Sequence, residues 1–192
     1  MKIILGSVSE RRKQILSYFS LPFIQKDSKY DESKLKIIED PIKYTCTLAE
    51  NKAKILSEKY PDNIILTADT VVFFENDYLL KPKDETEAKN MLKKLSNSWH
   101  QVFTGVCACK GGKCFSLSEE TKILFHKLDE RQIKLYHKKF YFMDKAGGYA
   151  IQKGGSVIVK KIEGCFYNIM GLPINTLKEV LLKVGIDLWE YL

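Results

Sequence analysis

The chain has 192 residues, of which 45% are hydrophobic and 29% are charged. This composition is typical of a globular protein and excludes a disordered or collagen-like chain. The longest apolar runs span about four residues, far below the ~18 that a membrane span requires. The apolar run after Met1 is also too short for a signal peptide. We therefore expect one domain over residues 1–192, located in the cytoplasm and without a membrane partner.

A net charge of +7 favours acidic partners such as nucleotides and phosphates. The basic residues are dispersed, and no nucleic-acid recognition motif accompanies them, so we expect no specific nucleic-acid binding.

Five cysteines are present, and in a cytoplasmic chain we expect them to be reduced thiols. Cys107, Cys109 and Cys114 do not follow a standard zinc spacing. We interpret them as small core or surface residues.

The first half of the chain alternates strands and helices. A polar turn at 6–9 separates a short strand from a helix, and Ser9 is a suitable N-cap for that helix. A loop with a short helix is expected over 30–40. The pattern predicts strands at 2–5, 21–25 and 64–74, and helices at 10–19 and 41–60.

The second half contains a hairpin, because Gly111 and Gly112 separate two alternating runs. The pattern predicts strands at 78–81, 99–109, 113–125 and 156–162, and helices at 84–95, 129–138 and 174–184. We predict an α/β fold with a mixed sheet. Periodicity alone does not reveal whether two lobes enclose a cleft.

The segment from Ser7 to Arg12 joins a strand to a helix N-terminus, which offers free backbone N–H groups to an anion. Arg11 and Arg12 lie in the first helical turn, and guanidinium groups bind phosphate bidentately. A solvated basic pair on an ordinary helix is the alternative.

Asp69 lies inside an otherwise apolar strand, where a carboxylate is costly unless it is paired or bound to a metal. Glu32 and Glu50 supply further carboxylates, and such groups together with substrate phosphates bind Mg²⁺. The alternative for Asp69 is a strand end hydrogen-bonded to a turn, and Glu32 or Glu50 taken alone is more typical of a solvated surface than of a ligand.

Two lysines and one glutamine complete the candidates. Lys81 follows a predicted strand and precedes a proline that holds it in extended backbone, and Lys52, in the same predicted helix as Glu50, is the other candidate cation. Gln152 ends a glycine-containing string that begins at Asp144, and its amide could recognise a nucleobase edge. A surface glutamine on a glycine-rich loop is the alternative.

These motifs resemble the Maf family over residues 2 to about 184. The resemblance is carried by Ser7-x-Ser9-x-Arg11-Arg12, Ala68-Asp69-Thr70-Val71-Val72, Lys81-Pro82 and the string Asp144-Lys145-Ala146-Gly147-Gly148-Tyr149-Ala150-Ile151-Gln152. It implies an elongated mixed sheet flanked by helices, similar to inosine triphosphatase, with two lobes and a cleft. It also implies hydrolysis of nucleoside triphosphates to monophosphate and pyrophosphate, with a divalent cation (Mg²⁺ or Mn²⁺) and often a homodimer.

The resemblance also assigns roles to individual residues. It implies that Asp69 is the general base and that Glu32, Lys52 and Lys81 are further catalytic residues. Our hypothesis is that Asp69 and Glu32 hold the metal. The implied substrate-binding residues are Ser7, Arg11, Arg12, Thr70 and Gln152. Arg11, Thr70 and Gln152 resemble the dTTP/UTP-type subgroup. A pyrophosphatase specific for 7-methyl-GTP and a low-turnover nucleotide-binding regulator of septum formation are the alternatives.

Two positions depart from the family pattern. Glu10 stands where proline is usual, and Asn97 stands where glycine is usual. Glutamate suits an early helical position, and asparagine tolerates left-handed backbone, so we expect both turns to be kept.

Overall fold

The computed structural model describes residues 2–192 and is built on one seven-stranded mixed sheet. The strand order is β2-β1-β3-β5-β6-β7, and β4 pairs with β3 outside this path. β1 is parallel to β2 and β3, whereas the other pairings are antiparallel. The strands are β1 (Ile3–Leu5), β2 (Phe23–Gln25), β3 (Ile64–Phe74), β4 (Asp77–Leu79), β5 (Trp99–Lys110), β6 (Lys113–Phe125) and β7 (Val159–Glu163).

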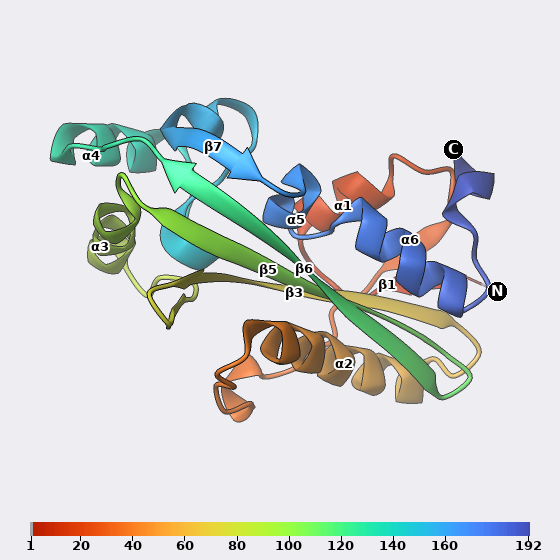
Figure 1. Ribbon diagram of the computed structural model, residues 1–192. Coiled ribbons are helices and arrows are strands. Elements are labelled where there is room, and N and C mark those ends of the chain that lie inside the picture. Colours follow the sequence, from red (N-terminus) through yellow and green to blue (C-terminus); the bar gives the residue numbers. More distant parts are fainter. Residues whose placement is uncertain (1) are drawn as a thin grey trace.

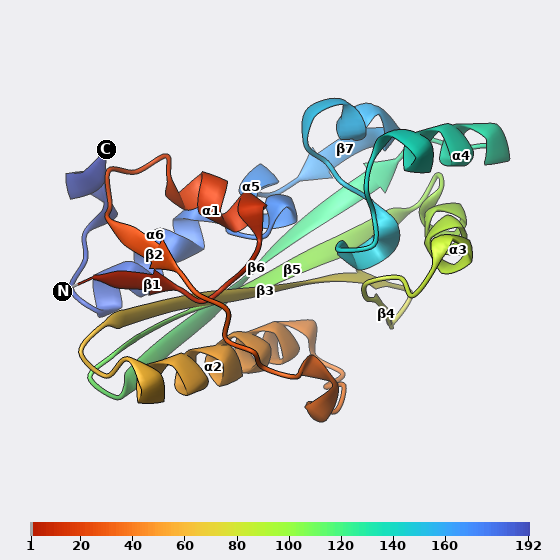
Figure 2. The ribbon, with the colours of Figure 1, turned by 180° about the vertical axis from the view of Figure 1, so that it is seen from behind.

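Helices cover both faces of this sheet (Figure 1), which confirms the predicted α/β class. The long helix α2 covers one face, and α1, α5 and α6 cover the other, while α3 and α4 lie at the far end of the long strands (Figures 1 and 2). None of the helices in residues 2–192 is long and apolar enough to cross a membrane. The helices are α1 (Glu10–Leu16), α2 (Pro41–Lys59), α3 (Glu85–Leu95), α4 (Glu130–Lys139), α5 (Phe166–Met170) and α6 (Ile174–Lys183).

Alternation along β3 sends neighbouring side chains to opposite layers. Ile65 packs with Ala49 and Ala53 of α2, whereas Leu66 belongs to the core that contains Leu177 of α6. The next residues continue this alternation. Asp69 therefore belongs to the α2 side of the sheet, and Thr70 belongs to the side of α1 and α5.

Helix α2 approaches the sheet closely because β5 carries a glycine beneath it. A Cβ on Gly105 would collide with the backbone of Thr45. Gly105 is also the residue that pairs with Asp69 in the β3–β5 register. The close approach therefore occurs beside the polar residue of β3.

The edge of β3 is open between two partners. β1 pairs only with Ile64–Leu66, and β4 pairs only with Val72–Phe74. Residues 67–71 lie between these pairings, and Asp69 and Thr70, which belong to opposite faces of the sheet, both line a cleft at this gap. Figure 2 shows the segment after β2 running from the α1 layer to the α2 layer, which places residues 26–40 beside α2.

Most predicted elements are confirmed, and the differences have local causes. The expected strand over 156–162 begins only at Val159, because the preceding residues Lys153–Ile158 form the 3₁₀ segment η3. Helix α5 was not predicted, since its five residues are too few to establish a period. The expected turns are kept at both positions that depart from the family pattern, Glu10 and Asn97. Ser9 caps the helix that begins at Glu10, and Asn97 adopts a positive φ of 56°.

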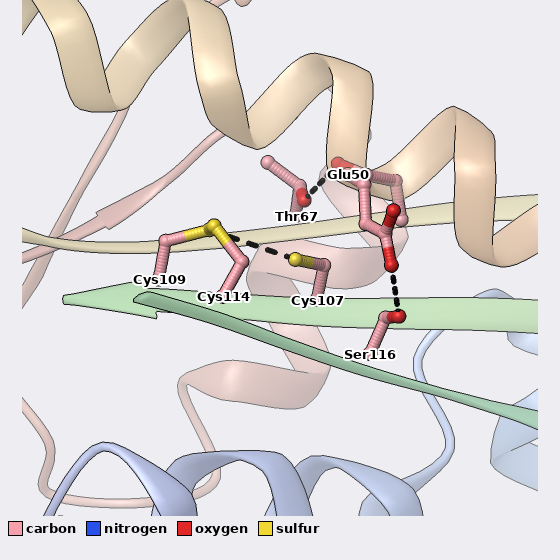
Figure 3. Close-up of a disulfide and its surroundings, with 7 residues drawn as sticks. Glu50, Thr67, Cys107, Cys109, Cys114 and Ser116 are labelled. Carbon is pink, nitrogen blue, oxygen red and sulfur yellow. Dashed lines mark hydrogen bonds between the residues drawn. A yellow bond between two sulfur atoms is a disulfide. The ribbon is translucent and has the colours of Figure 1, made fainter. Parts of the chain in front are cut away.

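The expectation that all cysteines are thiols is wrong for this structure. The β5–β6 register places Cys109 directly opposite Cys114, and the two form a disulfide (Figure 3). Cys107 remains a thiol with its Sγ 3.7 Å from that of Cys109. Burial raises the pKa of Cys107 to about 12, with Glu50 adding to the shift, so this thiol stays protonated.

The disulfide should contribute measurably to stability. It closes a short loop, for which the chain-entropy account gives about 2 kcal/mol. We expect a reductant to lower the unfolding free energy of the wild type by this amount in urea titrations. Cys114→Ser should start from the lower value and not respond to reductant. Cys165→Ser, which alters a free cysteine, is the matched control and should respond as the wild type does. Equal insensitivity of wild type and Cys114→Ser would contradict the bond.

Candidate active site

A cleft of about 900 Å³ opens at the gap in the β3 edge. It extends along both faces of β3 and is bounded by the start of α1, the segment after β2, and the 144–152 segment. Glu50, which the sequence also offers as a metal-binding carboxylate, does not line this cleft and instead accepts a hydrogen bond from Ser116. All nine residues to which the family resemblance assigns a role do line it. They are Ser7, Arg11, Arg12, Glu32, Lys52, Asp69, Thr70, Lys81 and Gln152.

The turn after β1 directs Arg12 into the cleft. Ser9 caps α1 by accepting the backbone N–H of Arg12 at 3.5 Å, as its position predicts. The Arg12 guanidinium donates to Ser7 Oγ at 3.2 Å, Thr70 Oγ1 at 3.0 Å and the carbonyl of Gly171 at 2.8 Å. Burial lowers the pKa of Arg12 below its ordinary value, opposed by the charge of Asp69, and a guanidinium remains protonated in proteins. Arg12 is thus a fixed cation with a defined orientation.

On the α2 side, one ammonium joins two carboxylates. Lys52 Nζ donates to Glu32 Oε1 at 2.7 Å and makes a close ion pair with Asp69 Oδ2. Lys52 and Asp69 are buried, whereas Glu32 lies in the short 3₁₀ turn η1 (Glu32–Lys34) and is partly exposed. Among residues 2–192, Lys52 is the one side chain with a hydrogen bond to Asp69, so the second carboxylate oxygen has no such partner.

Glu32 is held in its ionised form. Burial opposes ionisation, but Lys52, Lys81 and Arg12 outweigh it and lower the pKa of the Glu32 carboxyl. Lys81 contributes from a more exposed position, with its Nζ 3.7 Å from Glu32 Oε2. The Glu32 carboxylate therefore carries negative charge beside these three cations.

The opposite rim of the cleft contains charged residues of the Asp144–Gln152 string to which the family resemblance assigns no role. Asp144 lies 3.3 Å from Arg11 and 2.5 Å from Lys145. These two cations outweigh the effect of burial and lower the pKa of Asp144. Lys145 also lines the cleft, and its place in the Asp144–Gln152 string was the signal available in the sequence. Gln152 lies at the exposed rim, where its amide donates to Gln14 at 3.3 Å.

The segment that carries Gln152 is anchored from behind by aromatic residues. The hydroxyl of Tyr136 donates to the carbonyl of Ala150 at 2.5 Å and accepts its N–H at 3.0 Å. His100 is hydrogen-bonded to the Tyr149 hydroxyl at 2.9 Å, and His137 to the carbonyl of Gly148 at 3.0 Å. These buried bonds give the rim a fixed position.

The donor set beside Lys52 suits a hard divalent cation. Asp69 and Glu32 contact the same ammonium, so their carboxylates lie close together. Oxygen ligands of this kind, completed by phosphate oxygens and water, are what Mg²⁺ prefers. The residues present therefore fit the expected metal.

Comparison with known proteins agrees with the family that the sequence motifs resemble. A family model described as Maf-like protein matches residues 2–184. A dTTP/UTP pyrophosphatase of Chlamydia trachomatis serovar L2 is 43% identical over 192 residues, covering all of this chain and 98% of that protein. A dTTP/UTP pyrophosphatase of Acholeplasma laidlawii is 44% identical over 179 residues, covering 93% of this chain and 94% of the other.

A similarity to solved structures is more distant. The nucleoside-triphosphatase / dITP/XTP pyrophosphatase of Mycobacterium abscessus aligns with 96% of this chain and 94% of its own, with a TM-score of 0.48 and 10% identity.

Removing Lys52 should destabilise the protein far more than removing Lys81. Lys52→Met leaves the buried Asp69 carboxylate unpaired, which costs about 3–5 kcal/mol. Lys81→Met breaks an exposed pair and should cost less than about 1 kcal/mol. Urea unfolding at neutral pH measures both. Adding Asp69→Asn to Lys52→Met should recover part of the loss, because it removes the unpaired charge. Similar losses for the two lysine variants would contradict this account.

Proposed function

Because the chain belongs to the Maf family, we propose that it hydrolyses nucleoside triphosphates, dTTP and UTP in particular, to the monophosphate and pyrophosphate. The observation that carries this proposal is the pairing of Asp69 and Glu32 through Lys52 inside a cleft that also holds Arg12. Carboxylates that can accept a proton or bind a cation thus face cations that can bind phosphates. The named relatives of similar length support the same reaction.

The triphosphate is proposed to lie across the edge of β3. Arg12 approaches from the α1 side, and Lys52 and Lys81 approach from the α2 side. Ser7 and the backbone at the start of α1 complete the phosphate site, since a helix N-terminus attracts anions. These cations would neutralise charge on the departing pyrophosphate.

Asp69 is proposed as the general base. Lys52 occupies one of its oxygens and holds the carboxylate in place. The other oxygen would accept the proton of a water that attacks the α-phosphorus in line, and the bond to the β-phosphate oxygen would break. A divalent cation held by Asp69 and Glu32 would add Lewis-acid charge at the phosphates and acidify its water ligands.

Nucleotide choice is proposed to depend on the rim. Gln152 can present one acceptor and two donors to a uracil-type edge, which offers carbonyl oxygens and one N–H. Its bond to Gln14 is exposed, so the amide can turn toward a base at little cost. Arg11 lies on the same side of the cleft, held by Asp144.

Cellular context and assembly follow from the family only as proposals. We propose a cytoplasmic enzyme, where its nucleotide substrates would be found, acting in house-cleaning of nucleotides, in control of cell division, or in both. A second copy of this chain is the proposed protein partner.

Replacing the proposed base should abolish most turnover without unfolding the protein. Asp69→Asn keeps the size of the side chain but removes its basicity, so kcat should fall by roughly 10²–10⁴-fold. Pyrophosphate release from dTTP is the assay, and circular dichroism and nucleotide binding verify the fold. Asp62→Asn, which changes an exposed carboxylate, is the control and should be fully active. A folded Asp69→Asn with wild-type turnover would refute the assignment.

A substrate panel should reveal the expected preference. We expect pyrophosphate release from dTTP and UTP with Mg²⁺ or Mn²⁺, little from CTP, GTP, ATP and 7-methyl-GTP, and none with EDTA, since the cation and Gln152 are both needed. Turnover of 7-methyl-GTP instead would contradict the roles proposed for Arg11 and Gln152. Tight nucleotide binding without turnover of any triphosphate would favour the binding regulator.

A further inference from the structure

A series of hydrogen bonds between polar groups leads from Arg12 into the interior of the protein. Arg12 donates to Thr70 Oγ1, which lies 2.9 Å from Thr104 Oγ1, and Thr104 donates to the backbone carbonyl of Asn168 at 3.0 Å. Thr104 and Asn168 are completely buried. Burying such groups is costly unless they are hydrogen-bonded, so each link stabilises its neighbours.

The groups at the two ends of this hydrogen-bond series determine which hydroxyl donates and which accepts at each link. A hydroxyl has one proton to donate. The carbonyl of Asn168 can only accept, so Thr104 uses its proton there. Thr104 must then accept from Thr70, and Thr70 in turn accepts from the guanidinium of Arg12. Thr70 therefore has no proton left for a nucleobase carbonyl.

Helix α5 anchors the Asn168 end of this hydrogen-bond series. The Asn168 side chain donates to the carbonyl of Val102 and to Thr121 Oγ1, both at 2.9 Å. The carbonyl of Gly171, the C-cap residue of α5, accepts directly from Arg12 Nε. The same helix thus holds Arg12 twice, once through Gly171 and once through the two threonines.

We propose that Thr104 and Asn168 are positioning residues, which act through Thr70 to orient the Arg12 guanidinium toward the phosphates of the substrate. The influence of Thr70 on catalysis then runs through Arg12 rather than through contact with the base. This inference rests on the proposed function only in giving Arg12 a phosphate ligand.

The first test removes the hydroxyl of Thr104 and keeps its shape. Thr104→Val should raise the KM for dTTP and the inhibition constant of inorganic pyrophosphate about tenfold, the effect of losing one hydrogen bond of this kind. Thr104→Ser keeps the hydroxyl and should stay within about threefold of the wild type. Thr176→Val removes a buried hydroxyl that bonds Glu119 outside the cleft, and it should leave both constants unchanged.

A double-mutant cycle separates positioning from a general loss of structure. In an Arg12→Lys background, Thr104→Val should have little further effect, because the planar guanidinium that Thr70 orients has been replaced by an ammonium. Equal effects of Thr104→Val in both backgrounds, or wild-type constants for Thr104→Val, would overturn the proposal. If Thr104→Val does not fold, Thr104→Ala is measured in the same cycle with the same criteria.

Failure of the proposed function gives a different result. A wild type that turns over no triphosphate refutes the pyrophosphatase activity alone. Titration calorimetry with inorganic pyrophosphate then tests the positioning role on the same variants. Weaker pyrophosphate binding by Thr104→Val than by Thr104→Ser supports it, and equal binding overturns it.

Discussion

The ion pairs of Lys52 are the interaction on which the rest of the site depends. One buried ammonium holds Asp69 and the partly exposed Glu32, which come from a strand and a loop far apart in sequence. Removing two charges from water is favourable only when their geometry is good. Here the geometry requires α2 to lie close against the sheet, and the absent side chain of Gly105 permits that approach. The packing of α2 against the sheet therefore fixes both the local fold and the position of the charged groups in the cleft.

A second constraint comes from the alternation of side chains along β3. Asp69 and Thr70 are neighbours in sequence but belong to opposite faces of the sheet. In a fully paired strand these faces would be separated by the sheet itself. The open edge between the β1 and β4 pairings lets both side chains line one cleft. Cations from α1 and α2 can therefore converge on a single ligand although their helices lie on different layers.

Local sequence patterns predict much of this structure because helix caps and apolar periodicity reflect interactions of residues that are close in the sequence. Ser9 caps α1, and the apolar spacing of α2, the apolar run of β3 and the alternation of β5 correspond to the elements observed. The family motifs likewise nominate nine residues that the structure places in one cleft. Short or irregular segments carry weaker signals, which is why α5 was missed and the start of β7 was misplaced. The roles of Asp144 and Lys145 at the rim became visible only from the contacts that Asp144 makes with Arg11 and with Lys145.

The amino-acid sequence by itself determined the α/β class, the elements with a clear period, and which residues carry the family motifs. Tertiary structure alone decided which of these residues touch. The pairing of Cys109 with Cys114 follows from strand register, and the order of donors from Arg12 to Asn168 follows from packing between four elements. The physical reason is that hydrogen bonds and ion pairs act over a few ångströms in space. Residues separated by tens of positions come within that range only when the sheet and its helical layers are assembled.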